Sequence, residues 1–139
     1  MPTMRPVLLM LAILFVSGCV EPTSPELPTP EEQAREKLKL GLDAWVFGDA
    51  FLKFKNDHPD ISFVDTDWGG GEVLLSYEIG QARTHNFKRK DGPDVYTTDF
   101  VVTIVQYTNS GSEVKKSKKF SVSSPRGESD QWSILGVRQ

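Results

Sequence analysis

Residues 94–108 read Asp-Val-Tyr-Thr-Thr-Asp-Phe-Val-Val-Thr-Ile-Val-Gln-Tyr-Thr, and this stretch decides the fold class. Aromatic and β-branched residues dominate it, as is typical of a strand. One face of an extended chain here carries Tyr96, Phe100, Val102 and Ile104, and the other carries Val95, Val101, Val105 and Tyr107. Because side chains alternate with a period of two, the stretch predicts a long β-strand.

Two turn signals flank this strand. Asp91-Gly92-Pro93 precedes it and Asn109-Ser110-Gly111 follows it, a pattern that favours hairpins. Apolar residues with the same alternation predict four more strands, at residues 61–65, 73–87, 114–122 and 132–135. Four lysines cluster around residue 117, which is typical of a solvated edge strand.

A long helix is predicted before the strands. Thr29 suits the N-cap, Pro30 suits the first helical position, and Glu32 completes a capping box. Apolar residues at helical spacing follow, up to a glycine that suits the C-terminal cap: Ala34, Leu38, Leu42, Trp45 and Gly48. We expect Trp45 to lie beside Leu42, where the helix meets the sheet. A second, shorter apolar segment covers residues 49–57.

These elements predict an α+β fold in which the helix packs on an antiparallel sheet of four to five strands. Their order over about residues 30–139 resembles the cystatin-like and nuclear transport factor 2-like group, which implies a sheet bent around the helix. The pattern Leu42-Asp-Ala-Trp45…Gly48, Pro59-Asp-Ile…Asp65-x-Asp67-Trp68…Leu75-x-Tyr77-x-Ile79 is also similar to small proteins of planctomycete bacteria with no assigned activity. That similarity implies a fold and no chemistry.

The first 18 residues have the pattern of a signal peptide. Arg5 precedes the apolar run from Val7 to Val16, which would rise about 15 Å as a helix, half of a bilayer core. The sequence Val16-Ser17-Gly18-Cys19 resembles a bacterial lipobox and holds the chain's one cysteine. The alternative is an ordinary secretory signal in which the cysteine is incidental.

The lipobox resemblance implies that Cys19 becomes the mature N-terminus and carries acyl chains that anchor the protein in a membrane. Val20 stands where the enterobacterial retention signal has aspartate, which implies the outer membrane, facing the periplasm. We therefore predict a protein of the bacterial cell envelope. Closely spaced prolines predict an extended tether over residues 19–29, followed by a single domain over residues 30–139.

The composition of the chain argues against several classes of function and of binding site. The chain has 139 residues, room for one domain, and a formal net charge of −3, which argues against broad nucleic-acid binding. One cysteine excludes an internal disulfide and Cys-rich zinc sites, and two histidines exclude most His-based metal sites. No cofactor is predicted, and no Ser-His-Asp or Cys-His arrangement can be proposed.

The acidic residues Asp65, Asp67 and Glu72 surround three glycines, which suggests a calcium loop. The EF-hand pattern fails, because Gly69 occupies the third acidic position and the glutamate comes too early. A phosphate-binding loop also fails, since no Lys-Ser/Thr follows the glycines. A flexible connection between strands is the better interpretation of residues 67–71.

Asp99 is a candidate catalytic residue, because it interrupts an apolar strand. Resemblance to enzymes of the nuclear transport factor 2-like group implies an acid or base in a cavity, with a pKa raised by burial. The alternative is a partly solvated carboxylate, or one that pairs with Arg83 or His85 across the sheet. We favour this alternative, because no second catalytic residue can be identified.

Two basic runs form the other candidate site. They are Arg83, Lys88, Arg89 and Lys90 before the first turn, and Lys115, Lys116, Lys118 and Lys119 after the second. If their strands lie close, they form one patch for an anionic glycan, a lipid headgroup or an acidic protein. The alternative, which we favour, is a solubilising edge that prevents pairing between molecules.

The leading functional hypothesis is a membrane-anchored envelope lipoprotein that is not an enzyme. Its domain would bind or scaffold an unknown envelope protein or glycan, and a homodimer could form through the open sheet face. The alternative is a cavity-bearing enzyme of the nuclear transport factor 2-like kind that uses Asp99. A closed apolar pocket around Asp99 would favour the enzyme, whereas an open polar face would favour a scaffold or a dimer surface.

Overall fold

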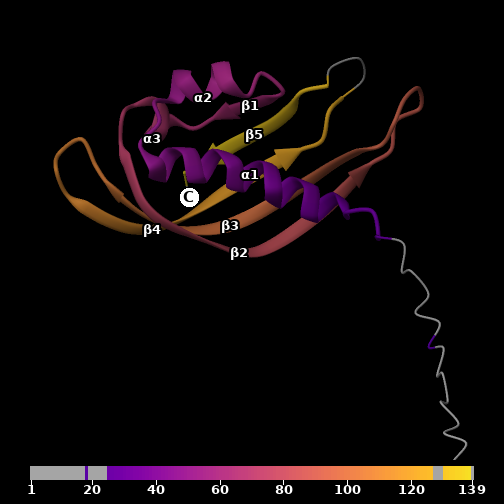
Figure 1. Ribbon diagram of the computed structural model, residues 1–139, viewed down its shortest axis with the longest axis horizontal. Coiled ribbons are helices and arrows are strands. Elements are labelled where there is room, and N and C mark those ends of the chain that lie inside the picture. The colour runs from indigo at the N-terminus through magenta and orange to yellow at the C-terminus, as the bar shows by residue number, and fades with distance from the viewer. Residues whose placement is uncertain (1–17, 19–24, 127–129, 139) are drawn as a thin grey trace, which may run out of the picture.

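The computed structural model describes residue 18, residues 25–126 and residues 130–138. Its elements are α1 (Pro30–Phe47), α2 (Phe51–Asp57), β1 (Ile61–Val64), α3 (Thr66–Gly69), β2 (Val73–Phe87), β3 (Val95–Tyr107), β4 (Glu113–Ser123) and β5 (Trp132–Val137). The strands form one five-stranded sheet in the order β1-β5-β4-β3-β2. Figure 1 shows α1 lying along one face of the sheet, with β2 and β3 curving beneath it. The prediction of an α+β fold with a helix packed on a sheet is confirmed.

Capping residues set the limits of α1. Thr29 Oγ1 accepts a hydrogen bond from the backbone amide of Glu32 at 3.2 Å, and Glu32 Oε2 accepts one from the amide of Thr29 at 2.7 Å. These two bonds satisfy amides that have no partner within the helix. Gly48 adopts a left-handed conformation with a φ of 94°, which ends the helix and favours glycine. The predicted helix is confirmed at both ends.

The prediction of a wholly antiparallel sheet is wrong at one edge. Strands β2 to β5 pair antiparallel with their neighbours in sequence, whereas β1 pairs parallel to β5, with Ile61 opposite Trp132. A tight hairpin forces two strands to run in opposite directions, but most of the domain separates β1 from β5. The relative direction of β1 and β5 depends on the path of the chain between them, and local sequence patterns do not predict that path. The sheet is therefore mixed.

The prediction that the lysine-rich strand is a solvated edge is also wrong. Strand β4 lies between β3 and β5, and the edges of the sheet are β1 and β2. The register places Lys116 opposite Ile104 and Lys118 opposite Val102, on the face that α1 covers. Lys118 is fully buried there, whereas Lys115 is exposed on the other face, which we call the outer face.

The core lies between the helices and the covered face of the sheet. Its members are apolar side chains from all eight elements: Ala34, Leu38, Leu42, Trp45, Phe54, Ile61, Phe63, Trp68, Leu74, Phe100, Val102, Ile104, Phe120, Val122 and Ile134. Trp45 is buried in this core with Leu42, which confirms its predicted place where the helix meets the sheet. Gly41 allows α1 to approach closely, because a Cβ at this position would overlap the ring of Phe63.

Candidate functional site

A groove with a volume of about 580 Å³ lies where α1 ends, and we call it the aromatic groove. Its lining comes from α1, α2, α3 and the start of β2: Trp45, Gly48, Asp49, Ala50, Phe51, Leu52, Trp68, Gly69, Gly71, Glu72 and Val73. Most of the lining surface is apolar. A concave, mainly apolar surface of this size is the usual form of a binding site.

Three rings from three helices form the wall of the aromatic groove. The rings of Trp45 and Trp68 stack with 5.8 Å between their centroids, and Phe51 meets Trp68 edge-on at 5.4 Å. Asp65 holds Trp68 in place, because its Oδ1 accepts the backbone amides of Asp67 and Trp68 at 2.9 and 3.0 Å. These two bonds cap α3 at its N-terminus. The predicted loop at residues 67–71 is therefore wrong at its start, where a short helix forms.

Both indole N–H groups of the groove are already used within the domain. Trp45 Nε1 donates to the backbone oxygen of Glu72 at 2.7 Å, and Trp68 Nε1 donates to that of Asp49 at 3.1 Å. A buried indole usually finds such a partner, so the two bonds fix the rings without offering donors to a ligand. The rings can therefore contribute only apolar surface and stacking to a bound group.

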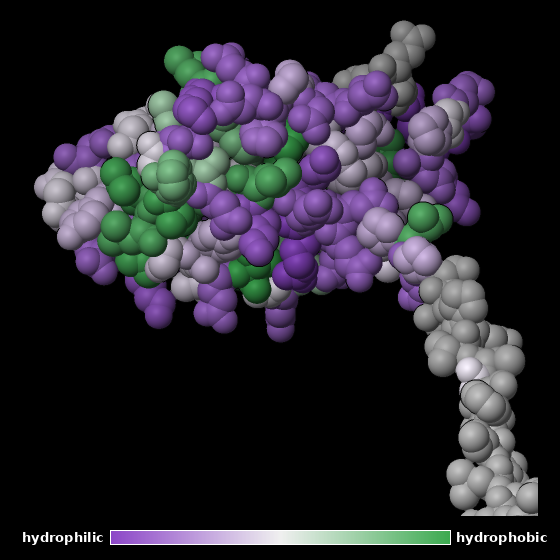
Figure 2. Space-filling view, viewed as in Figure 1, coloured by the Kyte–Doolittle hydropathy of each residue, from purple (hydrophilic) through white to green (hydrophobic). Residues whose placement is uncertain are grey.

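Exposed hydrophobic side chains surround the groove. Leu52 and Val73, which line it, are 69% and 49% exposed, and Phe47 at the end of α1 is 85% exposed. Figure 2 shows hydrophobic side chains gathered around the C-terminal end of α1 and the start of β2. A single exposed apolar residue is ordinary on a protein surface, but several beside an aromatic hollow are typical of an interaction site.

The groove lies far from the point where the N-terminal segment enters the domain. Residues 25–29 lead into α1 at its N-terminal end, and the groove lies at the other end of the same helix (Figure 1). A helix of 18 residues is about 27 Å long, so most of the domain separates the two points.

A second cluster, the Asp67 cluster, lies on the covered face of the sheet and consists of Asp65, Asp67, Lys116, Lys118 and Arg138. Lys118 Nζ lies 2.5 Å from Asp65 Oδ2 and 2.9 Å from Asp67 Oδ2. Arg138 Nη2 lies 2.6 Å from Asp67 Oδ1, and Lys116 Nζ lies 3.0 Å from Asp67 Oδ2. The carboxylates that suggested a calcium loop are therefore ion-paired with cations of β4 and the C-terminal segment.

The pairing keeps Asp67 ionised. Burial alone raises the pKa of this carboxyl, but hydrogen bonds from Arg138, Lys118 and Lys116 outweigh burial and hold the pKa well below its ordinary value. Gly136 leaves room for the neighbouring carboxylate, because a Cβ there would overlap Asp65. The cluster links the start of α3 to β4 and to the residue that follows β5, so we interpret its role as structural.

The Asp67 cluster was not predicted from the sequence, although the sequence contains one signal for it. Lys116 and Lys118 share the strand parity of Phe120 and Val122, which are the buried residues of β4. A strict reading of the two-residue period would have turned both lysines toward the core. Buried lysines need anionic partners. Asp65 and Asp67 were available as partners, because the calcium-loop pattern that would use them fails.

Asp99 lies on the outer face of the sheet, in an open hollow rather than a closed apolar pocket. Ser121 Oγ donates to Asp99 Oδ1 at 2.5 Å, Lys119 Nζ lies 3.3 Å from Oδ2, and His85 Nε2 lies 3.8 Å from Oδ2. Burial raises the pKa of Asp99, but Ser121, Lys119 and His85 together hold it below its ordinary value. An ionised carboxylate with a lowered pKa is a poor proton donor and a weak base, so this geometry does not favour the catalytic interpretation.

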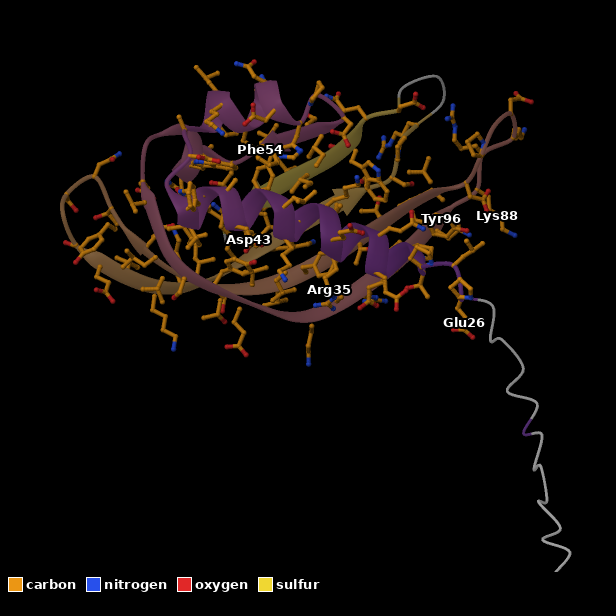
Figure 3. All side chains as sticks on the ribbon, viewed as in Figure 1. Glu26, Arg35, Asp43, Phe54, Lys88 and Tyr96 are labelled. Atoms are coloured by element: carbon orange, nitrogen blue, oxygen red, sulfur yellow. The ribbon has the colours of Figure 1, made fainter. Side chains whose placement is uncertain are left out.

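The structure does not bring the two basic runs into one patch. Lys116 and Lys118 point to the covered face, where they pair with Asp67, while Lys115 and Lys119 lie on the outer face. Arg83 and Lys119 both line the open hollow around Asp99 on the outer face. Residues 88–90 follow β2 in the connection to β3, and Figure 3 shows Lys88 at the same end of the molecule as Glu26.

The predicted lipid attachment at Cys19 and all of the predicted signal peptide at residues 1–18 except Gly18 lie outside the described residues. Within residues 25–126 and 130–138, no helix is long and apolar enough to cross a membrane. No set of three or more His, Cys, Asp or Glu side chains in these ranges is arranged to hold a metal ion. No known protein family, curated protein or solved structure matches this chain.

Proposed function

We propose that this chain is a lipid-anchored protein of the bacterial envelope whose domain acts by binding and not by catalysis. The observation that carries the proposal is the aromatic groove, an apolar hollow with exposed hydrophobic side chains on its rim. Acyl chains on Cys19 and the proline-rich tether would hold the N-terminal end of α1 toward the membrane. The groove, at the opposite end of α1, would then face away from the membrane and toward other envelope components.

The chemistry of the groove favours an apolar segment of another envelope protein as its ligand. Trp45 and Trp68 offer ring surface and no free indole donor, so the site suits aliphatic or aromatic side chains. Burying one large apolar side chain contributes about 1.5–3 kcal/mol, so several such contacts together are needed to outweigh the free-energy cost of association. A glycan is the competing ligand, because sugars also stack on aromatic rings.

The finer fold and location belong to the same proposal. A helix packed on a curved sheet supports the cystatin-like assignment, in which the sheet wraps the helix. Val20 supports the outer membrane facing the periplasm. Neither assignment is needed for the groove to bind.

A photocrosslinking experiment tests the groove. A photoreactive phenylalanine analogue at Leu52 is expected to give a discrete protein adduct in intact cells, whereas the same analogue at Val101, on the outer face, does not give that adduct. The two positions are matched, because both side chains are exposed hydrophobics. Adding Val73→Asp to the Leu52 probe should remove the adduct, since it places a charge on the groove wall.

Two results would refute the binding proposal. One is the same adduct from Leu52 and Val101, which would indicate collision without a site. The other is no protein adduct from Leu52 at any illumination time. An adduct that carries glycan in place of protein would refute the ligand class and keep the groove.

The anchor has its own test. Cys19→Ser is expected to abolish incorporation of a labelled fatty acid, because the thiol is the attachment point. Metabolic labelling followed by precipitation of the full chain measures this incorporation. Label on the serine variant equal to that on the wild type would exclude the lipobox interpretation without affecting the groove.

A further inference from the structure

We propose that two copies of this chain pair edge to edge through β2. The two strands run antiparallel about a twofold axis that passes between Gly80 and Gln81. The two five-stranded sheets then join into one continuous ten-stranded sheet. This inference is independent of the anchor and of the groove.

Strand β2 is the free edge that makes such pairing feasible. It is 15 residues long and stands last in the strand order, and no other described segment pairs with its outer edge. The opposite edge, β1, has four residues and offers little backbone to a second copy. An edge strand with unpaired N–H and C=O groups is a template for another strand, and its own copy is always available.

Two charged residues of β2 select the register. Glu78 and Arg83 are both exposed, and within the described residues neither side chain takes part in a hydrogen bond or an ion pair. They carry opposite charge at equal distances from the point between Gly80 and Gln81. Twofold pairing about that point sets Glu78 of each copy opposite Arg83 of the other. In this register the two copies therefore form two equivalent pairs of opposite charge, and opposite charges across neighbouring strands stabilise their pairing.

A β-bulge at the same point allows residues that face each other across the axis to lie on the same face of the sheet. Gly80 and Gln81 together oppose the single residue Val101, so Ile79 and Ala82 both point to the covered face, opposite Val102 and Phe100. In a regular strand, residues 79 and 82 would point to opposite faces, and self-pairing in this register would set core-facing side chains against solvent-facing ones. The bulge removes this conflict.

The side chains that meet across the axis then match by face. On the covered side, Ile79 opposes Ala82 of the second copy, and Tyr77 opposes Thr84. On the outer side, Glu78 opposes Arg83, and Ser76 opposes His85. In the joined sheet, covered-face side chains therefore meet covered-face side chains, and outer-face side chains meet outer-face side chains.

Sedimentation equilibrium of the full chain in detergent, over a range of protein concentrations, measures the pairing. The wild-type chain is expected to show a monomer–dimer equilibrium. Glu78→Arg or Arg83→Glu turns both ion pairs into like-charge pairs, and each should weaken dimerisation by about tenfold to a hundredfold. The double exchange Glu78→Arg with Arg83→Glu restores opposite charges and should recover dimerisation to within about threefold of the wild type.

Lys115→Glu is the matched control for Arg83→Glu, because it makes the same charge change on the outer face of β4. It should leave the dimerisation constant unchanged. Thermal unfolding of each variant confirms the fold, and Glu78→Arg keeps the test independent of Asp99, which pairs in register with Arg83. A wild-type chain that stays monomeric, or a dimer that neither single reversal weakens, would overturn the proposal.

Discussion

Replacing Trp45 by alanine is expected to lower the free energy of unfolding by about 3–5 kcal/mol. The side chain is 2% exposed, stacks on Trp68 and donates to the backbone oxygen of Glu72 at 2.7 Å. Alanine removes the ring, leaves a cavity between α1 and the sheet, and deprives a backbone oxygen of its donor. A domain of this size has about 5–15 kcal/mol in total, so urea unfolding of the full chain should show a large drop in midpoint.

Trp45→Phe separates the packing from the hydrogen bond. Phenylalanine keeps part of the buried aromatic surface but loses the Nε1 donor, so its loss of stability should be clearly smaller than that of alanine. A midpoint for the alanine variant equal to that of the wild type would mean that the ring contributes nothing to the core. Equal losses for alanine and phenylalanine would assign the effect to the bond to Glu72.

Features with local causes could be predicted from the sequence. Thr29, Glu32 and Gly48 fix the limits of α1 through contacts within one helical turn, so three residues were enough. The alternation along residues 95–107 likewise predicted β3 and placed Phe100, Val102 and Ile104, which the structure buries, on one face. In both cases the physical cause lies within a few residues along the chain.

Features set by distant segments could not be predicted in the same way. The parallel pairing of β1 with β5 depends on the path of the chain between them. The bulges of β2 reverse which residues face the core, so Leu74 and Tyr77 both point inward although their parity differs. Strict alternation along a regular strand would place these two residues on opposite faces.

The candidate site combines both kinds of feature. Trp45 was identified as a residue of the helix–sheet contact, which is correct, but nothing local predicts that Trp68 stacks on it. The groove exists because Gly48 turns the chain and α2 and α3 place Phe51 and Trp68 beside the end of α1. A binding site built from four elements becomes visible only when the elements are in place.

Removing the ammonium group of Lys118 is expected to destabilise the domain as strongly as the loss of Trp45. Lys118 is fully buried and pairs with Asp65 at 2.5 Å and with Asp67 at 2.9 Å. Lys118→Ala leaves these two buried carboxylates without their shared cation. Asp67 keeps Lys116 and Arg138, but Asp65 keeps no cation. Leaving a buried charge without its partner costs about 3–5 kcal/mol.

Two further variants show whether charge or packing is responsible. Lys118→Met keeps an unbranched side chain of similar length without the charge, so it should lose nearly as much stability as alanine if the ion pairs matter. Lys115→Ala removes an exposed lysine of the same strand and should change the free energy of unfolding by less than about 0.5 kcal/mol. Urea unfolding of the three variants measures these differences in the free energy of unfolding. A methionine variant as stable as the wild type would show that Lys118 only fills space, and that the Asp67 cluster does not tie α3 to the sheet.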